Sequence, residues 1–224
     1  MTMGNSPGAG QADQTVVLAD PSDLDVLSHV IADAFHDLAP SRWLITDPAA
    51  RRAIFPGYFR LHLEHAMASG IVHTTPGRTA AALWIPAGRN AAGRADGHDA
   101  RLAAATSPWT SQFAAFDAAL DRHQPAGIPH YHLVILAVRP DRQGRGTGTA
   151  LLRAFHAALD HAGTPAYLEA SGPRTRHLYL SHGYADHGPP VHLPAGPDMY
   201  PMWRPAKPRR KTHHRGTETE PCLS

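Results

Sequence analysis

Apolar positions follow two different spacings along the second half of the chain. Residues 131–138 form an almost unbroken apolar run, which predicts a buried strand. After a polar, glycine-rich turn, apolar side chains recur at helical spacing over residues 151–159, and residues 165–170 form another short apolar run. The pattern predicts strand, turn, helix and strand in succession, which is typical of an α/β domain.

The first half carries start and stop signals for helices and a hairpin. Residues 15–18 predict an opening strand, and Asp20-Pro-Ser-Asp23 predicts the cap of a helix reaching Phe35. A second helix is expected from Asp47-Pro48 to about Ser69, kinked or divided at Pro56-Gly57 because proline lacks a helical N–H. The turn Pro76-Gly77-Arg78 between two apolar runs predicts an antiparallel hairpin.

The remaining segments are expected to complete one domain. Residues 87–97 predict a surface loop, and residues 101–122 a helix that breaks at Ser107-Pro108. Residues 184–193 and 198–203 predict two closing strands. Residues 1–14 and 206–224 lack periodic apolar positions and are expected to be disordered, the second as a basic and then acidic tail. The folded domain is therefore expected over residues 15–205.

Composition excludes several classes of protein. The 224 residues are 42% hydrophobic and 18% charged, which suits one globular domain. The net charge of +2 is small and the arginines are dispersed outside the tail, so no nucleic-acid partner is expected and the tail is interpreted as solvated. Cys222 is the only cysteine, and no apolar run approaches the roughly 18 residues of a membrane span. We expect a soluble cytoplasmic protein without a membrane partner, with a homodimer left open.

The turn after residue 138 has the composition of a phosphate-binding loop. Three glycines, Gly144, Gly146 and Gly148, open the way to the backbone N–H groups of the following helix, whose first turn favours an anion. Arg142 and Arg145 add positive charge there. A P-loop would need Gly-Lys-Ser/Thr, which is absent, and a dinucleotide fingerprint would need its third glycine where Leu151 stands. A plain strand-to-helix connection remains the alternative.

The spacing Gln143-x-x-Gly146-x-Gly148 resembles the coenzyme A pyrophosphate loop of the GNAT superfamily of N-acetyltransferases. The chain is also similar to that superfamily downstream, where Tyr179 stands four residues before the pair Gly183-Tyr184. More narrowly, several short motifs resemble the puromycin N-acetyltransferases and their actinobacterial relatives. These motifs are Ala34-Phe35, Asp47-Pro48, Ala82-Leu-Trp84, Pro165-Ala-Tyr-Leu-Glu169, Pro173-Arg174 and Pro194-Ala-Gly-Pro197. The likeness spans roughly residues 15–205 and is firmer in the second half.

The resemblance implies a GNAT fold, with a mixed sheet of about six to seven strands flanked by helices. It implies acetyl-CoA as the acetyl donor and co-substrate, with the strand before the loop splaying from the next one around the pantetheine arm. The acetyl carbonyl is expected to accept a backbone N–H near Val138, where the superfamily strand is interrupted. The expected cofactor-binding residues are Leu136, Val138, Arg142, Gln143, Gly144, Arg145, Gly146, Thr147, Gly148, Thr149 and Thr175. Thr175 stands where many members have Asn, so its contact would have a shorter reach.

The implied reaction is attack of a neutral amine on the thioester, which needs an acid and a base. Tyr179 matches the family's acid, since a phenol stays protonated at neutral pH and can donate to a leaving thiolate. A core tyrosine is the alternative. Glu169 is the expected base, with a structural ion pair as its alternative, and His130 and His132 are the other candidates for the base.

The acceptor is expected to be a small-molecule amine, such as an antibiotic or another secondary metabolite. Phe35, Trp43, Tyr58 and Trp109 are candidates to line its pocket. No metal is expected, because Asp96-x-His98-Asp99, His130-x-His132 and His213-His214 lack zinc-site spacing. An O-acyltransferase, a transferase for longer acyl-CoA and a non-catalytic acyl-CoA sensor remain alternatives.

Overall fold

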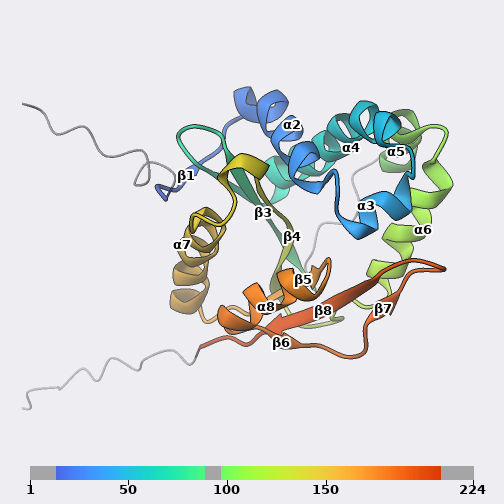
Figure 1. The fold of residues 1–224 in the computed structure, drawn as a ribbon. Coiled ribbons are helices and arrows are strands. Elements are labelled where there is room, and N and C mark those ends of the chain that lie inside the picture. Colours follow the sequence, from blue (N-terminus) through green and yellow to red (C-terminus); the bar gives the residue numbers. More distant parts are fainter. Residues whose placement is uncertain (1–13, 89–96, 208–224) are drawn as a thin grey trace, which may run out of the picture.

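A mixed β-sheet with helices on both faces forms the centre of the protein, in a computed structural model that describes residues 14–88 and 97–207 (Figure 1). The described helices are α2 (Leu24–Phe35), α3 (Ala39–Leu44), α4 (Pro48–Ser69), α5 (His98–Thr106), α6 (Thr110–Asp121), α7 (Thr147–Ala162) and α8 (Pro173–Ser181), with 3₁₀ turns η1 (Pro21–Asp23) and η2 (Pro140–Arg142). The described strands are β1 (Val17–Leu18), β2 (Ile71–Thr74), β3 (Ala80–Ala87), β4 (His130–Val138), β5 (Ala166–Ala170), β6 (Ala185–Asp186), β7 (Val191–His192) and β8 (Asp198–Arg204).

The sheet of the described residues has eight strands, in the order β1-β2-β3-β4-β5-β8-β6, with β7 also pairing with β8. Its pairs are antiparallel except for β4 with β5. The strand count exceeds the expected six to seven because residues 184–193 form two short strands, and the prediction of one strand there was wrong. Gly188-Pro189-Pro190 separates β6 from β7, since proline has no N–H to donate to a ladder.

Two hydrophobic cores lie on opposite faces of this sheet. Helices α2, α4, α5 and α6 cover one face, and α7 and α8 cover the other. Strand β3 serves both cores, because Leu83 faces the first and Trp84 faces the second. A strand buried on both faces has apolar residues at successive positions, as Ala80–Ala87 does.

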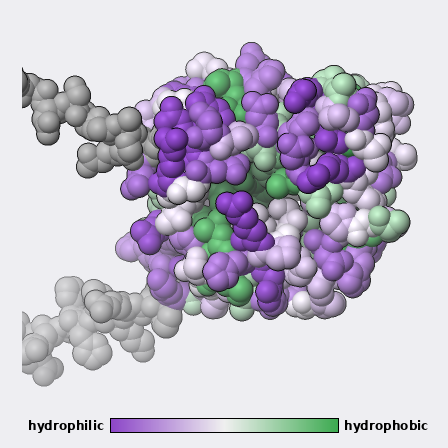
Figure 2. Space-filling model, viewed as in Figure 1, coloured by the Kyte–Doolittle hydropathy of each residue, from purple (hydrophilic) through white to green (hydrophobic). Residues whose placement is uncertain are grey.

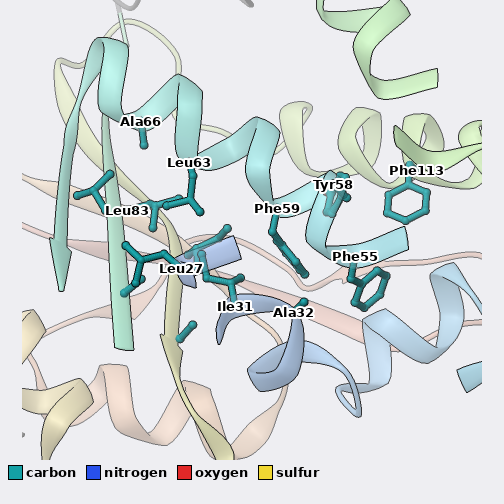
Figure 3. Packing of buried hydrophobic residues seen from close by; sticks show 14 of the residues in the cluster. Leu27, Ile31, Ala32, Phe55, Tyr58, Phe59, Leu63, Ala66, Leu83 and Phe113 are labelled. Carbon is teal, nitrogen blue, oxygen red and sulfur yellow. The ribbon is translucent and has the colours of Figure 1, made fainter. Parts of the chain in front are cut away.

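Helices α2 and α4 pack against each other over the first core (Figure 3). Leu27 and Ile31 of α2 lie beside Phe59 and Leu63 of α4, and all four side chains are buried. The start of each helix agrees with the sequence prediction. Asp20 accepts a hydrogen bond from the Ser22 N–H ahead of η1 and α2, and the Asp47 carboxylate accepts from the first turn of α4.

Most other predicted elements are confirmed, with exceptions in the first half. The β2–β3 hairpin and the break between α5 and α6 at Ser107-Pro108 are present. The opening strand is shorter than predicted, and α3 was not predicted. Of the two outcomes expected at Pro56, a kink or a division, division does not occur, because α4 continues through it. Most of the predicted loop 87–97, and both predicted tails except their inner residues, lie outside the described residues.

Candidate active site

The parallel strands β4 and β5 pair at one end only. Tyr131 pairs with Ala166 and His132 with Tyr167, and no further pair joins the two strands. From Leu133 to Val138, β4 therefore has no strand partner on its β5 side, although β3 pairs with its other edge on both sides of Val134. This geometry agrees with the splay that the resemblance implied, and it leaves backbone groups of β4 available to a ligand in the slot.

Strand β4 is irregular near the middle of its length. Leu83 of β3 pairs with Ile135, whereas the next residue, Trp84, pairs with Leu133. Val134 is thus the extra residue of a β-bulge, a feature that redirects backbone groups beside ligand sites. The sequence analysis expected this interruption near Val138, which was wrong: Val138 is in the regular part of the ladder, opposite Ala80.

The glycine-rich turn connects β4 with α7. Gly144 and Gly146 have φ of +76° and +86°, which L side chains rarely adopt, so both positions need glycine. Within the described residues, no backbone carbonyl accepts from the N–H groups of residues 144–149. These groups and the N-terminal end of the α7 dipole form a site for an anion, which fits the pyrophosphate of coenzyme A.

Two residues of this turn behave differently from expectation. The Gln143 N–H donates to Pro140 O within the η2 turn, at 3.4 Å, while the Gln143 side-chain amide donates to Val138 O at 3.0 Å. Gln143 therefore holds the turn against the end of β4 rather than offering its own N–H to an anion. Arg145 is exposed and does not line the cavity described below, whereas Arg142 does.

A cavity of about 600 Å³ joins the slot, the turn and the first half of the chain. Figure 2 shows a hollow near the centre of the face seen there, with hydrophobic residues around its opening. The sequence-predicted site residues that line the cavity are Leu136, Val138, Arg142, Gln143, Gly144, Gly146, Thr147, Gly148, Thr149, Glu169, Thr175 and Tyr179. Residues far apart in sequence thus share one space.

Thr175 has a local partner as well as a place on the cavity wall. Its hydroxyl donates to Gly172 O at 3.0 Å, at the start of α8. Its oxygen also lies 3.4 Å from the Ser171 hydroxyl, which donates to it, so one lone pair is left for a ligand that donates a hydrogen bond.

Tyr179 reaches the cavity from α8 and is otherwise buried, with 7% of its surface exposed. Its ring contacts Tyr184 edge to face, at 5.7 Å between centroids. Burial raises the pKa of the Tyr179 phenol, so the group stays protonated throughout the neutral range. This state suits the role of acid that the sequence suggested.

Behind Tyr179 lies a buried histidine that the sequence analysis missed. His156 of α7 is within 3.1 Å of the Tyr184 hydroxyl through Nε2, and its ring contacts Trp84. Burial, helped by the nearby charge of Arg204, lowers the pKa of His156 to about 3. The signal was hidden because His156 occupies a helix face that reads as apolar, beside Phe155.

The candidates for the base come together in part. His132 Nε2 lies 2.8 Å from Glu169 Oε2, and both side chains line the cavity. Each side chain is nearly buried, with 11% of His132 and 5% of Glu169 exposed. His130 does not line the cavity; its Nδ1 lies 2.7 Å from Ile128 O, and burial lowers its pKa. The structure therefore pairs two of the three candidates and separates the third.

Apolar side chains from α2, α4 and α6 form the wall opposite β4 and α8. Phe35, Tyr58, Phe59 and Phe116 line it, and Asp117 is the acidic residue of this wall. Two other expected pocket residues lie elsewhere. The Trp43 indole donates to Pro194 O at 2.8 Å, and Trp109 packs against the first core.

None of the helices among the described residues is long and apolar enough to cross a bilayer. The described residues also contain no group of three or more His, Cys, Asp or Glu side chains arranged to hold a metal ion. Asp96 and the pair His213-His214 lie outside the described residues.

Comparison with known proteins agrees with this geometry. The sequence model of the acetyltransferase (GNAT) domain matches residues 112–186, which include β4, the glycine-rich turn and α8. A Corynebacterium glutamicum structure described as a histone acetyltransferase HPA2 and related acetyltransferase has 25% identity and a TM-score of 0.66, over 87% of this chain and 97% of that one.

Two more distant structures share the fold. Arylalkylamine N-acetyltransferase 2 of Aedes aegypti has 12% identity and a TM-score of 0.57, over 85% of this chain and 98% of that one. A GCN5-related N-acetyltransferase from Rhodopseudomonas palustris has 12% identity and a TM-score of 0.52, over 85% and 94%. The fold and the site thus define an acyltransferase of the N-acetyltransferase type. Residues 112–186 match the GNAT acetyltransferase domain, and the structure has the same fold as the acetyltransferases compared above.

Proposed function

We propose that the protein is an acetyl-CoA-dependent N-acetyltransferase for small-molecule amines. One observation supports this most directly: a single cavity holds the anion-binding turn, Tyr179, the His132–Glu169 pair and an apolar wall from the first half. The proposed substrates are amines with a sizeable apolar body, such as antibiotics or other secondary metabolites.

Donor binding is assigned to the turn and to the slot. The N–H groups of residues 144–149 would hold the pyrophosphate, with Arg142 adding positive charge from the cavity wall. The edge of β4 between Leu133 and Ala137, which has no strand partner, would bind the pantetheine arm through alternate backbone groups. Acetyl-CoA supplies the acetyl group as an activated thioester.

The transfer requires stabilisation of a negative oxygen and the movement of two protons. A backbone N–H at the Val134 bulge, which is part of the cavity wall, would stabilise charge that develops on the acetyl oxygen. The amine nitrogen bonds to the carbonyl carbon as the carbon–sulfur bond breaks. The His132–Glu169 pair would take the amine proton, and Tyr179 would protonate the leaving sulfur.

The acceptor side favours an apolar amine. The aromatic residues Phe35, Tyr58, Phe59 and Phe116 offer broad apolar faces, and a carboxylate such as Asp117 attracts a cationic substrate before its proton is removed. Motif resemblance makes puromycin a suitable first substrate, because it carries both an aromatic group and a free amine.

The test is release of coenzyme A thiol from acetyl-CoA with puromycin and with a panel of unrelated amines. We expect release with at least one amine, and a fall in kcat of about 10²-fold or more in Tyr179→Phe. Tyr200→Phe is the matched control, since Tyr200 lies on β8 and does not line this cavity. Donors of different acyl length in the same assay separate acetyl transfer from transfer of longer chains.

Absence of both coenzyme A binding and thiol release would refute the proposal. Binding of coenzyme A without turnover on any amine would favour an acyl-CoA sensor. Release with an alcohol but with no amine would favour an O-acyltransferase.

A further inference from the structure

His132 and Glu169 form a pair in which the two side chains have different contacts. We infer that His132 Nδ1 is the atom that takes the substrate proton, and that Glu169 is a positioning residue that orients the imidazole. This inference rests on the proposed acetyl transfer, and it reverses the order in which the sequence ranked the two residues.

Access to the Glu169 carboxylate is restricted. Glu169 Oε2 is engaged by His132 Nε2 at 2.8 Å. The other oxygen, Oε1, is buried and has no hydrogen-bond partner among the described residues. A general base must come within hydrogen-bond reach of the proton that it removes. Since Oε1 is covered and Oε2 already accepts from His132, the carboxylate is less accessible to a substrate proton than the free nitrogen of His132.

The contact with Glu169 determines the tautomer of His132. A carboxylate accepts hydrogen bonds, so Nε2 carries the ring proton in the neutral imidazole and Nδ1 holds the lone pair. Nδ1 makes no hydrogen bond with a described residue, and His132 lines the cavity. The ring is thus held by a buried carboxylate at one nitrogen and is available to substrate at the other, the arrangement by which hydrolases orient a histidine base.

His132 lies in the sheet at the point where β4 and β5 separate. The pair His132 and Tyr167 is the last one between β4 and β5, so His132 stands where the two strands begin to diverge. The Val134 bulge follows two residues later. A base at this point is next to the backbone assigned to the acetyl oxygen, at the closed end of the slot.

Among the titratable groups around His132, Glu169 is the acidic one that contacts the His132 ring. His130 of β4 is kept neutral by burial, which lowers its pKa, and burial together with the Glu169 charge raises the pKa of Tyr167 of β5. Across the cavity, α4 contributes His62 and α6 contributes Asp117. The Glu169 carboxylate is therefore the acidic group that holds His132 by its Nε2.

In the transfer step, the amine proton moves to His132 Nδ1 as the carbon–nitrogen bond forms. The carbon–sulfur bond breaks, and the thiolate takes its proton from Tyr179. The neutral products are an acetamide and the thiol of coenzyme A. The proton on His132 is then released to solvent and Tyr179 regains one, which restores both groups.

The kinetic test compares pH profiles of kcat/KM for the wild type, His132→Gln and Glu169→Gln, using the amine that supports turnover. We expect His132→Gln to lose about 10²- to 10⁴-fold in kcat and to lose the acid limb of the profile. Glu169→Gln should keep that limb and lose less in kcat than His132→Gln, because the imidazole that takes the proton is still present. His130→Gln is the matched control, since it alters another ring beside Tyr167 but lies off the cavity.

The opposite pattern would overturn the inference: an acid limb kept in His132→Gln and abolished in Glu169→Gln would make Glu169 the base. Unchanged turnover in both variants would remove the pair from catalysis. Thermal unfolding of each variant shows whether a loss of rate reflects a loss of fold.

A second measurement needs no substrate. ¹⁵N NMR of histidine-labelled protein, with His132→Gln to assign the signal, reports which ring nitrogen is protonated. We expect Nε2 protonated and Nδ1 bare in the neutral ring, and the reverse tautomer would overturn the inference. If no amine supports turnover and coenzyme A does not bind, the proposed function fails, while this measurement still decides the arrangement of the pair.

Discussion

Replacing His156 by phenylalanine should change how the stability of the protein depends on pH. His156 is buried against Trp84 and Tyr184, and its pKa is lowered to about 3 from an ordinary value of 6.5. Below pH 6.5 the unfolded chain takes up a proton at this position while the folded chain does not. Acid therefore favours unfolding. The contribution of His156 to the free energy of unfolding is highest above pH 6.5 and declines as the pH falls from 6.5 toward 3.

The size of the effect follows from linkage. A displaced pKa of this extent gives a loss of up to about 2 kcal/mol between about pH 7.5 and about pH 5, since each pKa unit corresponds to about 1.4 kcal/mol. The His156→Phe variant cannot take up the proton, so its stability lacks this contribution. It should instead be less stable near neutrality by about 1 kcal/mol or more, because the Tyr184 hydroxyl loses its partner.

The assay is urea unfolding followed by tryptophan fluorescence at a series of pH values, for the wild type and the variant. The difference in unfolding free energy between them cancels the contributions of the other histidines, and it should shrink or reverse as pH falls. His161→Gln, at an exposed position on the same helix, is the control for the loss of a histidine. A constant difference for His156→Phe would refute the reasoning, because it would mean that His156 protonates equally in both states.

Two further predictions concern the donor and acceptor sides. Gly146→Ala should raise the KM for acetyl-CoA several-fold with little change in kcat. The reason is that an alanine in the left-handed conformation at φ +86° costs roughly 1 kcal/mol and disturbs the anion-binding turn. The control is Gly97→Ala, at φ +73° before α5, which should lower stability by a similar amount and leave the KM unchanged. Arg51→Met should lower the free energy of unfolding by about 2 to 4 kcal/mol, since buried Arg51 donates to the carbonyls of His36, Ile45 and Thr46. It should also raise the KM for the amine more than the KM for acetyl-CoA. Arg52 is exposed, so Arg52→Met should change neither the stability nor the KM values. Steady-state kinetics and urea unfolding check both, and an equal effect of Gly146→Ala and Gly97→Ala on KM, or of Arg51→Met and Arg52→Met on stability, would contradict them.

The sequence by itself predicted most local elements and the turn that is proposed to bind the donor. Capping residues such as Asp47 and the glycines of the turn act over a few residues, so their meaning can be read without knowledge of distant contacts. The position of Tyr179 came from the resemblance, and the structure places it on the wall of the same cavity as the turn. The division of residues 184–193 was also readable, since Pro189 and Pro190 mark it, but the segment was interpreted as one strand.

Only the tertiary structure decided how distant segments meet. The Val134 bulge lies in a run of branched residues without glycine or proline, and it arises from pairing with β3. His132 and Glu169 are 37 residues apart, and His156 and Tyr184 are 28 apart, so their contacts depend on strand register and on the packing of α7. Periodicity reports which face of an element is buried, whereas register and packing decide which atoms face one another, and the chemistry of this site depends on those atoms.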